Sequence, residues 1–348
     1  MKRNNFKTVC VNLDRETLDQ IIDSFLINEF PTRSTVNRFC GKSAKAISTV
    51  ANALVETNIM GKKLYKDVDS TKSELHYTLS PRLCVVVIDI SSSIFKISAF
   101  SKSLECIFFD KYVCNPELFF EDNFILFLSR CLAKLIELKI PYDNVCLIYS
   151  ENSPDSIPIT TDVPSIHNKE AVENIVAGIM RRSVLSHTTV SRSFADAKKY
   201  KLCDFEKGAC YLFFGTRLLL VYINDDGSVF CSYPERLIIK EQLTVRDRFS
   251  SAFTDSEFTS MLCLLSNFAV SAFDPQTLFI SSDTNDIDKN FIENYLQAYS
   301  TAKYTPPRVR VDSSRPSLYV KGAAVSAIAK LIKANILTNA EYKNTHDQ

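Results

Sequence analysis

The stretch 85-VVVIDISSSIFKISAF-100 decides how the chain is interpreted. It predicts two β-strands, Val85–Ile90 and Ile94–Ala99, separated by a tight turn. The turn begins at Asp89 and continues with three serines, Ser91, Ser92 and Ser93. A nucleotide-binding loop would carry glycines here, because glycine lets backbone N–H groups close on a phosphate. The chain has only 7 glycines. The stretch is therefore an intact phosphate loop, an altered one or an ordinary hairpin.

The composition indicates a globular protein with sizeable cores. The chain has 348 residues, 46% of them apolar, and its net charge of +1 gives no global sign of a nucleic-acid or membrane partner. No apolar run reaches the length of about eighteen residues that a membrane span needs, and the basic N-terminus lacks the apolar segment of a signal peptide. The 11 cysteines are scattered without a C-x-x-C pair, so we expect reduced thiols, no metal site and a cytoplasmic location.

Residues 1–80 predict helices followed by a β-hairpin. A helix from Arg15 places apolar side chains on one face, and a short helix capped by Thr32 or Ser34 follows. A third helix shows the same periodicity. The residues expected to face inward are Leu18, Ile21, Ile22 and Phe25 in the first helix and Ile47, Val50, Ala51, Leu54 and Val55 in the third. The stretch 61-GKKLYKDVDSTKSELHYTLS-80 predicts two strands joined by a polar loop.

This order, with a sharp turn at Gly41 and a third helix capped by Ser43, is typical of a winged helix-turn-helix. In that geometry the third helix enters the DNA major groove. Its solvent face would carry Ser43, Lys45, Ala46, Ser48, Thr49 and Asn52, flanked by Arg33 and Lys42, with Lys62, Lys63 and Lys66 at the start of the hairpin. Short polar side chains suit contact with base edges, and lysines suit phosphates. Residues 1–80 also carry 12 Lys and Arg against 9 Asp and Glu. The alternative is a packing subdomain that does not bind DNA.

After Pro81 strands and helices alternate, which indicates mixed sheets with helices on both faces, arranged in two lobes. The further expected strands are Glu105–Lys111, Val145–Tyr149, Thr188–Val190, Ala209–Phe214, Arg217–Ile223, Thr277–Ile280 and Arg308–Val311. The expected helices are Phe119–Leu138, Lys169–Val184, Ser193–Tyr200, Asp255–Phe268, Asp286–Tyr299 and Gly322–Ala334.

Several stretches in this order resemble the ROK family of repressors and sugar kinases. They are 32-TRSTVNRFCGKSAKAISTVANALVETNIM-60, the hairpin 85–100, 190-VSRSFADAKKY-200, 211-YLFFGTRLLLVYINDDG-227 and 321-KGAAVSAIAKLI-332. The resemblance covers nearly the whole chain. It implies an N-terminal winged helix-turn-helix in residues 1–80. It also implies an actin-like ATPase (ribonuclease H-like) α/β fold in two lobes, with a cleft between them, in residues 81–348.

The residues that carry the family's kinase chemistry are altered. The first phosphate loop, Asp-Ile-Gly-Gly-Thr-Lys in the family, here keeps Asp89 but places serines at the glycines. In the second loop Gly215 and Thr216 persist, but Arg217 replaces a glycine. The catalytic Asp aligns with Ser193, whose hydroxyl pKa is far too high for a general base. The sugar motif and zinc loop expected after residue 227 are missing, since 228-SVFCSYPERLIIKEQLTVRDRF-249 has one Cys and no His.

The sequence therefore predicts a transcriptional regulator with a catalytically inactive kinase-like domain. We expect double-stranded DNA as its partner, a homodimer, no cofactor, no metal and no membrane association. The resemblance implies that such regulators use the kinase-like domain for dimerisation and sugar sensing, but the sugar motif is missing, so the effector stays open. One alternative is an atypical sugar kinase that uses Asp89 or Asp196. The other is an interaction scaffold that does not bind DNA.

Overall fold

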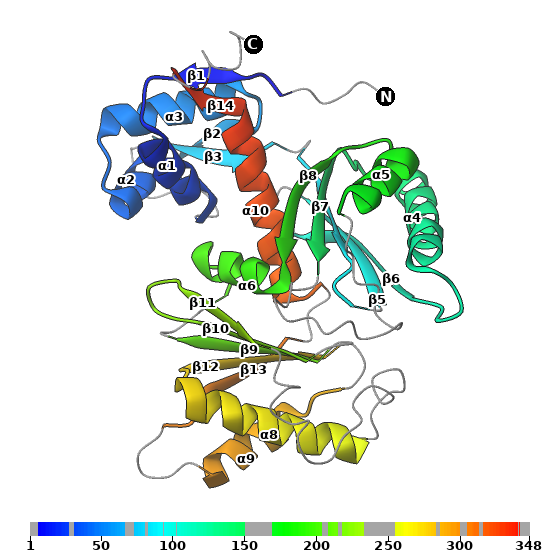
Figure 1. Cartoon of the computed structure of the whole chain (residues 1–348). Helices are drawn as coiled ribbons and strands as arrows, with labels where there is room; N and C mark the ends of the chain where they lie inside the picture. The colour runs from blue at the N-terminus through cyan, green and yellow to red at the C-terminus, as the bar shows by residue number, and fades with distance from the viewer. Residues whose placement is uncertain are drawn as a thin grey trace.

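The computed structural model shows N-terminal helices above two α/β lobes, with the last long helix running down to the junction between the lobes (Figure 1). The structure describes residues 6–27, 31–66, 73–80, 83–92, 94–101, 103–149, 169–203, 208–214, 218–232, 255–282, 286–299, 305–312, 316–339 and 341. Within these residues no helix is long and apolar enough to cross a membrane.

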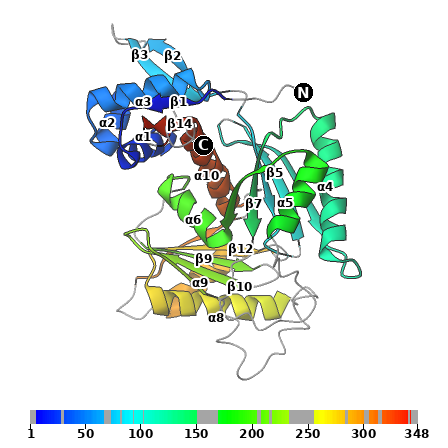
Figure 2. The ribbon, with the colours of Figure 1, turned by 45° about the horizontal axis from the view of Figure 1, so that its top comes forward.

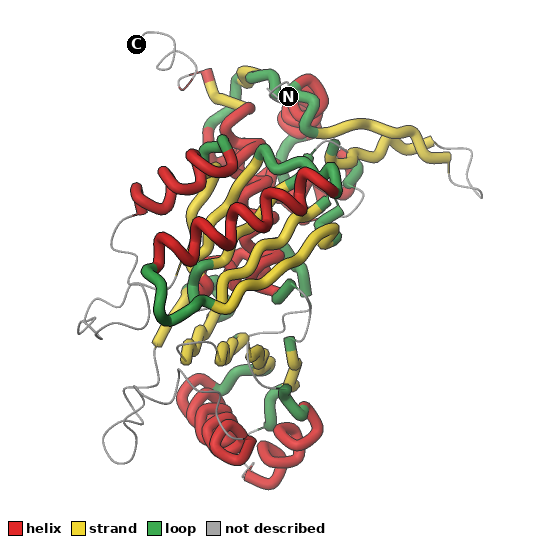
Figure 3. The backbone as a smooth tube through the Cα atoms, turned by 90° about the vertical axis from the view of Figure 1, so that its right-hand side faces the viewer, coloured by secondary structure: helices red, strands yellow, loops and turns green. Residues whose placement is uncertain are grey.

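The helices and the hairpin predicted for residues 1–80 are present. Their bounds are α1 (Arg15–Ile27), α2 (Arg33–Cys40), α3 (Ala44–Glu56), β2 (Met60–Lys66) and β3 (Ser73–Leu79). Strands β2 and β3 pair antiparallel and project from the body of the molecule (Figure 3). The predicted inward residues of α1 are all buried, and so are those of α3 apart from the half-buried Val55. Helix periodicity alone therefore located this core.

Local contacts explain where α2 begins and ends and where α3 begins. Thr32 and Thr35 form a capping box, in which each hydroxyl accepts a hydrogen bond from the other residue's N–H, at 3.2 and 2.7 Å. Gly41 ends α2 with φ of 63°, a left-handed conformation that costs glycine little. Ser43 starts α3, because its hydroxyl accepts from the N–H of Ala46 at 3.2 Å. The predicted caps and turn are confirmed.

The first lobe is a mixed sheet with strand order β6–β5–β4–β7–β8. Its strands are β4 (Val85–Asp89), β5 (Ile94–Phe100), β6 (Cys106–Val113), β7 (Asn144–Tyr149) and β8 (Val184–Thr189). Helices α4 (Phe120–Glu137) and α5 (Lys169–Met180) cover one face (Figures 1 and 3). Along β4, Val86 and Ile88 pack toward these helices, while Val85 and Val87 pack toward the opposite face. Strand β4 is thus buried on both sides, as its unbroken apolar run predicts.

The second lobe repeats this plan with strand order β11–β10–β9–β12–β13. Its elements are β9 (Ala209–Phe214), β10 (Leu218–Ile223), β11 (Val229–Ser232), α8 (Asp255–Phe273), β12 (Thr277–Ser282), α9 (Lys289–Tyr299) and β13 (Arg308–Val311). Leu212 and Phe214 pack toward α8 and α9, whereas Tyr211 and Phe213 point toward the first lobe. Strands β9 and β10, which were both predicted, pair antiparallel on either side of the second loop.

Helices α6 (Val190–Lys199) and α10 (Leu318–Asn335) lie between the two sheets (Figure 2). They approach so closely at Gly322 that a Cβ there would lie 1.9 Å from the carbonyl oxygen of Ser193. A real Cβ cannot occupy that position, so the backbones of the two helices touch only because residue 322 is glycine.

Two expectations about the elements are corrected. The helix predicted over Lys169–Val184 ends at Met180, because Arg181 adopts a left-handed φ of 53°. Val184 then begins β8, which is longer than the predicted strand Thr188–Val190. Three strands were not predicted: β11 at the edge of the second sheet, and β1 (Val9–Val11) and β14 (Ile336–Thr338), which pair in parallel and tie residues near the two ends of the chain together.

Candidate functional site

The outer face of α3 carries most of the side chains predicted to contact DNA. Ser43, Lys45 and Asn52 are exposed, and Ser48 and Thr49 are half-buried. The prediction that Ala46 lies on this face is wrong, since its exposed fraction is only 9% and it packs in the core. Successive residues of a helix are about 100° apart, so Ala46 lies one turn before the buried Val50, on the same inward face of α3.

Arg33 connects α2, α3 and the hairpin rather than standing apart from them. Its Nε donates to the hydroxyl of Tyr77 at 2.9 Å, and its Nη2 donates to Oδ1 of Asn52 at 3.1 Å. Tyr77 is buried and packs edge-on against Phe25, with ring centroids 5.3 Å apart. Because a guanidinium has donors only, Asn52 must turn its carbonyl oxygen toward Arg33. Its NH₂ group is therefore directed away from Arg33.

The turn between α2 and α3 is held by Asn37, whose Nδ2 donates to the carbonyl of Lys42 at 2.7 Å. The Lys42 side chain is half-buried. Beyond α3, Lys62 and Lys63 of the hairpin are exposed, as is Tyr65, and Lys63 Nζ lies 5.1 Å from the centre of the Tyr65 ring. The predicted DNA-contacting lysines thus all belong to the α2–α3 turn, α3 or the hairpin. Lys45, Lys62 and Lys63 are exposed, and Lys42 is half-buried. The side chain of residue 66 lies outside the described residues.

The loop after β4 is closed by its own side chains. Asp89 is 1% exposed, and its Oδ1 accepts from both the N–H and the hydroxyl of Ser91, at 3.0 and 2.6 Å. The hydroxyl of Ser92 bonds to the N–H and the carbonyl of Ile94. Ser93 lies outside the described residues. These contacts make Asp89 a turn-capping residue, with the serines filling the space where glycine backbone would otherwise be open.

Residues from both lobes meet above this loop in a buried group, Asp89, Lys96, Phe213 and Tyr319, here called the inter-lobe cluster. Tyr319, near the start of α10, donates to Asp89 Oδ2 at 2.6 Å. Lys96 is 7% exposed, its Nζ lying 3.8 Å from Asp89 Oδ2 and 5.3 Å from the Phe213 ring centre. A buried charge needs such a partner, because desolvating it alone costs several kcal/mol. Sequence reasoning missed Lys96 and Tyr319, although a lysine between apolar neighbours in a buried strand is a signal.

Ser193, which aligns with the family's catalytic Asp, is part of the packing between helices α6 and α10. Ser193 is fully buried, its hydroxyl is 3.1 Å from that of Thr188, and its carbonyl faces Gly322. Asp196, one turn along α6, is half-buried, and desolvation raises the pKa of its carboxyl above the ordinary value. Gly215 and Thr216 lie outside the described residues. Among the residues that the structure describes, no group of His, Cys, Asp and Glu is arranged to hold a metal.

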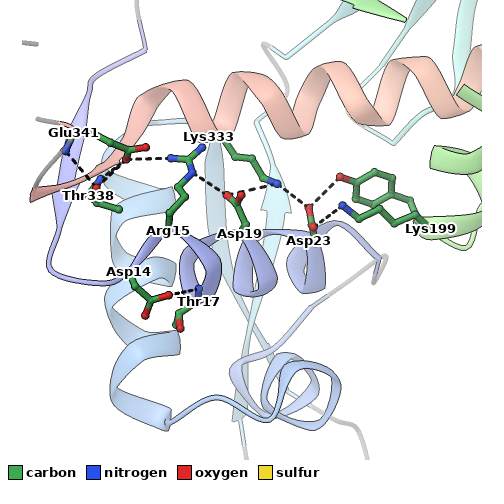
Figure 4. A network of polar contacts seen from close by, with 10 residues as sticks. Asp14, Arg15, Thr17, Asp19, Asp23, Lys199, Lys333, Thr338 and Glu341 are labelled. Carbon is green, nitrogen blue, oxygen red and sulfur yellow. Dashed lines mark hydrogen bonds and ion pairs between the residues drawn. The ribbon is translucent and has the colours of Figure 1, made fainter. Parts of the chain in front are cut away.

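A row of ion pairs joins α1 to the helices between the lobes (Figure 4). Lys333 of α10 places Nζ 3.5 Å from Asp19 Oδ1 and 3.4 Å from Asp23 Oδ1. Lys199 of α6 lies 2.7 Å from Asp23 Oδ2, and Tyr200 donates to Asp23 Oδ1 at 3.0 Å. The N-terminal helices are thus connected through α1 to both α6 and α10.

Comparisons with known proteins support the fold. No family model matches the sequence, and no curated protein matches it. The crystal structure of a ROK family transcriptional regulator, a homolog of the E. coli MLC protein, superposes with a TM-score of 0.56 at 10% identity, over 91% of this chain and 98% of that one. An inorganic polyphosphate/ATP-glucomannokinase from Arthrobacter sp. strain KM gives 0.48 at 11% identity, over 70% and 98%. A ROK hexokinase from Thermus thermophilus gives 0.42 at 14% identity, over 72% and 99%.

The superposition with the regulator covers 91% of this chain. Residues 81–348 make up a smaller share of the 348 residues than that, so the superposition must include part of residues 1–80. The two predicted mixed α/β lobes agree with this match and with the two five-stranded sheets. The overall fold of this chain is therefore similar to that of a solved ROK family protein, and the family resemblance noted in the sequence is confirmed at the level of the fold.

Proposed function

We propose that the chain is a DNA-binding transcriptional regulator in which residues 1–80 form a winged helix-turn-helix. The observation that carries the proposal is the outer face of α3, where short polar side chains and Lys45 are exposed beside a projecting hairpin. In a winged helix-turn-helix this helix contacts base edges in the major groove, and the hairpin contacts the phosphate backbone. Lys62 and Lys63 are suitably exposed for the second role.

The rigidity of the unit supports the same role. Asn37 holds the turn before α3, and Arg33 holds α3 against the hairpin through Asn52 and Tyr77. A recognition surface whose side chains are already oriented loses less conformational entropy on binding. The NH₂ of Asn52 is directed away from Arg33, so this residue would donate to an acceptor such as a base N7 or O6, or to a phosphate oxygen.

We further propose that the two lobes, residues 81–348, do not transfer phosphate from ATP and serve assembly and sensing instead. Both oxygens of Asp89 already accept hydrogen bonds, and Tyr319 and Lys96 fill the space above the loop. Ser193 is buried and cannot accept a proton from a sugar hydroxyl. As a homodimer, the protein would place two α3 helices in half-sites about one DNA turn apart.

The experiment that tests the proposal is selection of genomic fragments by the purified full-length protein at near-physiological salt, followed by sequencing. We expect enrichment of a palindromic site, and binding that weakens steeply as salt rises, because lysine–phosphate contacts release counterions. If no fragment is retained in a salt-sensitive manner, the proposal is wrong and the scaffold alternative is favoured.

Charge reversal at α3 localises the binding. Lys45→Glu should weaken binding to the selected fragment at least tenfold. The slope of log affinity against log salt concentration should also fall by about one, which corresponds to the loss of one phosphate contact. Lys289→Glu is the matched control, because it makes the same charge change on an exposed lysine of α9 in the second lobe. Equal effects of both variants would mean that DNA responds to net charge and not to α3.

A further inference from the structure

The side chains of Arg33 and Asn52 form a pair on the exposed side of the N-terminal unit. Arg33 is the first residue of α2, Asn52 lies on the outer face of α3, and both residues are exposed. Nη2 of Arg33 donates to Oδ1 of Asn52 at 3.1 Å, and Nε of Arg33 donates to the hydroxyl of the buried Tyr77 at 2.9 Å. Because both hydrogen bonds come from one planar guanidinium, they fix the orientation of that plane and with it the Asn52 amide.

This pair presents hydrogen-bond donors to a partner. The carbonyl oxygen of the Asn52 side chain is engaged by Arg33, which leaves its NH₂ group, and an NH₂ group can only donate. The guanidinium of Arg33 likewise carries donors and no acceptor. Glu74, the acidic residue of the nearby strand β3, accepts a hydrogen bond from the hydroxyl of Ser34 at 3.0 Å. The carboxylate of Glu74 is therefore turned toward the start of α2.

The charge of Arg33 opposes a second donor at the Asn52 carbonyl. A carbonyl oxygen has two lone pairs, so hydrogen bonding to Arg33 leaves one of them. A second N–H donor at that oxygen would lie beside the guanidinium, whose positive charge repels the positive end of an N–H group and attracts an acceptor. The surface around Asn52 therefore favours a partner that offers acceptors only.

The four bases differ in this respect in the major groove. Guanine offers two acceptors, N7 and O6, whereas adenine offers the acceptor N7 beside the donor N6. Cytosine offers a donor, and thymine offers one acceptor beside a methyl group. An asparagine with both ends free pairs with adenine, because its oxygen accepts from N6 while its NH₂ donates to N7. In this chain Arg33 occupies the oxygen of Asn52, so guanine is the base edge that fits the pair.

We propose that Asn52 recognises a guanine in each half-site of the bound DNA, its NH₂ group donating to O6 or N7, and that Arg33 is the positioning residue that makes Asn52 select guanine over adenine. The inference rests on the proposed function, because α3 must enter the major groove for Asn52 to reach a base. It adds the identity of the base. A DNA-binding protein in which Asn52 selects no guanine would overturn this inference and leave the proposed function standing.

The first test measures the affinity of the full-length protein for the selected fragment and for every single base-pair substitution of it. At one guanine in each half-site the wild type should prefer guanine to each other base by about tenfold, and Asn52→Ala should reduce this preference to about twofold or less. Asn294→Ala, at an exposed asparagine of α9, is the matched control and should keep the preference. If Asn52→Ala weakens binding equally whichever base is present, Asn52 contacts a phosphate and the inference is wrong.

A base analogue tests the groove with the wild-type protein alone. Hypoxanthine keeps the N7 and O6 acceptors of guanine but lacks the amino group that guanine presents in the minor groove. Fragments with hypoxanthine at the position identified by Asn52→Ala should bind as tightly as those with guanine. Binding that falls to the level of the adenine fragment would mean that the base is recognised from the minor groove, which overturns the inference.

Removal of Arg33 tests the positioning role. Arg33→Met frees the oxygen of Asn52, so the preferred base at the same position should change from guanine to adenine, a change that a loss of stability alone would not produce. Arg38→Met, at an exposed arginine of α2, is the matched control and should keep the preference for guanine. An unchanged circular dichroism spectrum verifies that the variants fold. A preference for guanine that persists in Arg33→Met overturns the inference, and a wild type that retains no DNA fragment overturns both it and the proposed function.

Discussion

The loop after β4 and the outer face of α3 are built from similar short polar residues, but their side chains face opposite ways. In the loop, Asp89, Ser91 and Ser92 bond to one another or to nearby backbone, and the carboxylate is buried. On α3, Lys45 and Asn52 are exposed, and only Asn52 bonds to a neighbouring element. Polar residues whose hydrogen bonds are completed inside the fold contribute to architecture, whereas exposed ones remain able to bind a partner.

The two regions also differ in how firmly their chains are held. The inter-lobe cluster joins β4, β5, β9 and α10 through a buried ion pair and two aromatic rings. Removing one partner from such a group leaves a buried polar atom with one partner fewer. This lowers the free energy of unfolding more than the loss of an exposed contact does. Substitutions between the lobes should therefore change stability, and substitutions on the outer face of α3 should change binding. The following variants test that division.

The largest effect is expected at Gly322. Gly322→Ala forces a methyl group against the Ser193 carbonyl, so α6 and α10 must separate, and the free energy of unfolding should fall by about 3 kcal/mol or more. Urea denaturation measures this loss. Gly178→Ala is the control, because nothing lies within 4 Å of its added methyl group on α5, and it should stabilise the protein by up to about 1 kcal/mol. Equal stabilities of the two variants would contradict the close helix contact.

The next effect is expected in the inter-lobe cluster. Asp89→Asn removes the carboxylate that lies 3.8 Å from the buried Lys96 Nζ and should lower the free energy of unfolding by about 3 kcal/mol. Lys96→Met should cost a similar amount because it leaves the carboxylate buried. The double variant removes both charges and should recover part of the loss. Additive losses in this double-mutant cycle, measured by urea denaturation, would show that the two residues act separately.

A smaller effect is expected where the two roles meet, at Arg33. Arg33→Lys keeps the charge but cannot donate to Tyr77 and Asn52 together, so stability should fall by about 1 kcal/mol. Binding to the selected DNA fragment should weaken too, because Asn52 loses its orientation. Arg38→Lys, at an exposed position on the same helix, serves as the control for both measurements. DNA affinity unchanged in Arg33→Lys would exclude the positioning role.

The smallest effect is expected at Asp196, whose carboxyl pKa is raised by burial. A carboxyl with a raised pKa in the folded state destabilises the fold when it is ionised, so the penalty is present at neutral pH and disappears below about pH 4. Asp196→Asn should therefore be up to about 1 kcal/mol more stable than the wild type at pH 7 and equal to it in acid. The side chain of Ser326 also forms a hydrogen bond with Asp196, which lowers the carboxyl pKa in part. A variant less stable than the wild type at pH 7 would mean that this hydrogen bond outweighs the cost of burial.

Local patterns in the sequence were sufficient to predict much of the fold. The inward stripe of α1, the caps Thr32 and Ser43, and the turn at Gly41 follow from helix periodicity and capping chemistry, which act within a few residues. The stretch 85–90 predicted a strand, which is present as β4. The alternation of strands and helices after residue 80 predicted two mixed sheets, and both are present.

The sequence by itself therefore determined the helices and the hairpin of residues 1–80, the caps of α2 and α3, and the exposed lysines Lys45, Lys62 and Lys63. Only the tertiary structure decided that Asp89 accepts from Tyr319, that Gly322 meets Ser193, and that β1 pairs with β14. It also decided that Lys96 is buried. These features join segments more than a hundred residues apart or depend on which surfaces the folded chain covers. Periodicity and propensity act over a few residues, so they carry no information about such contacts.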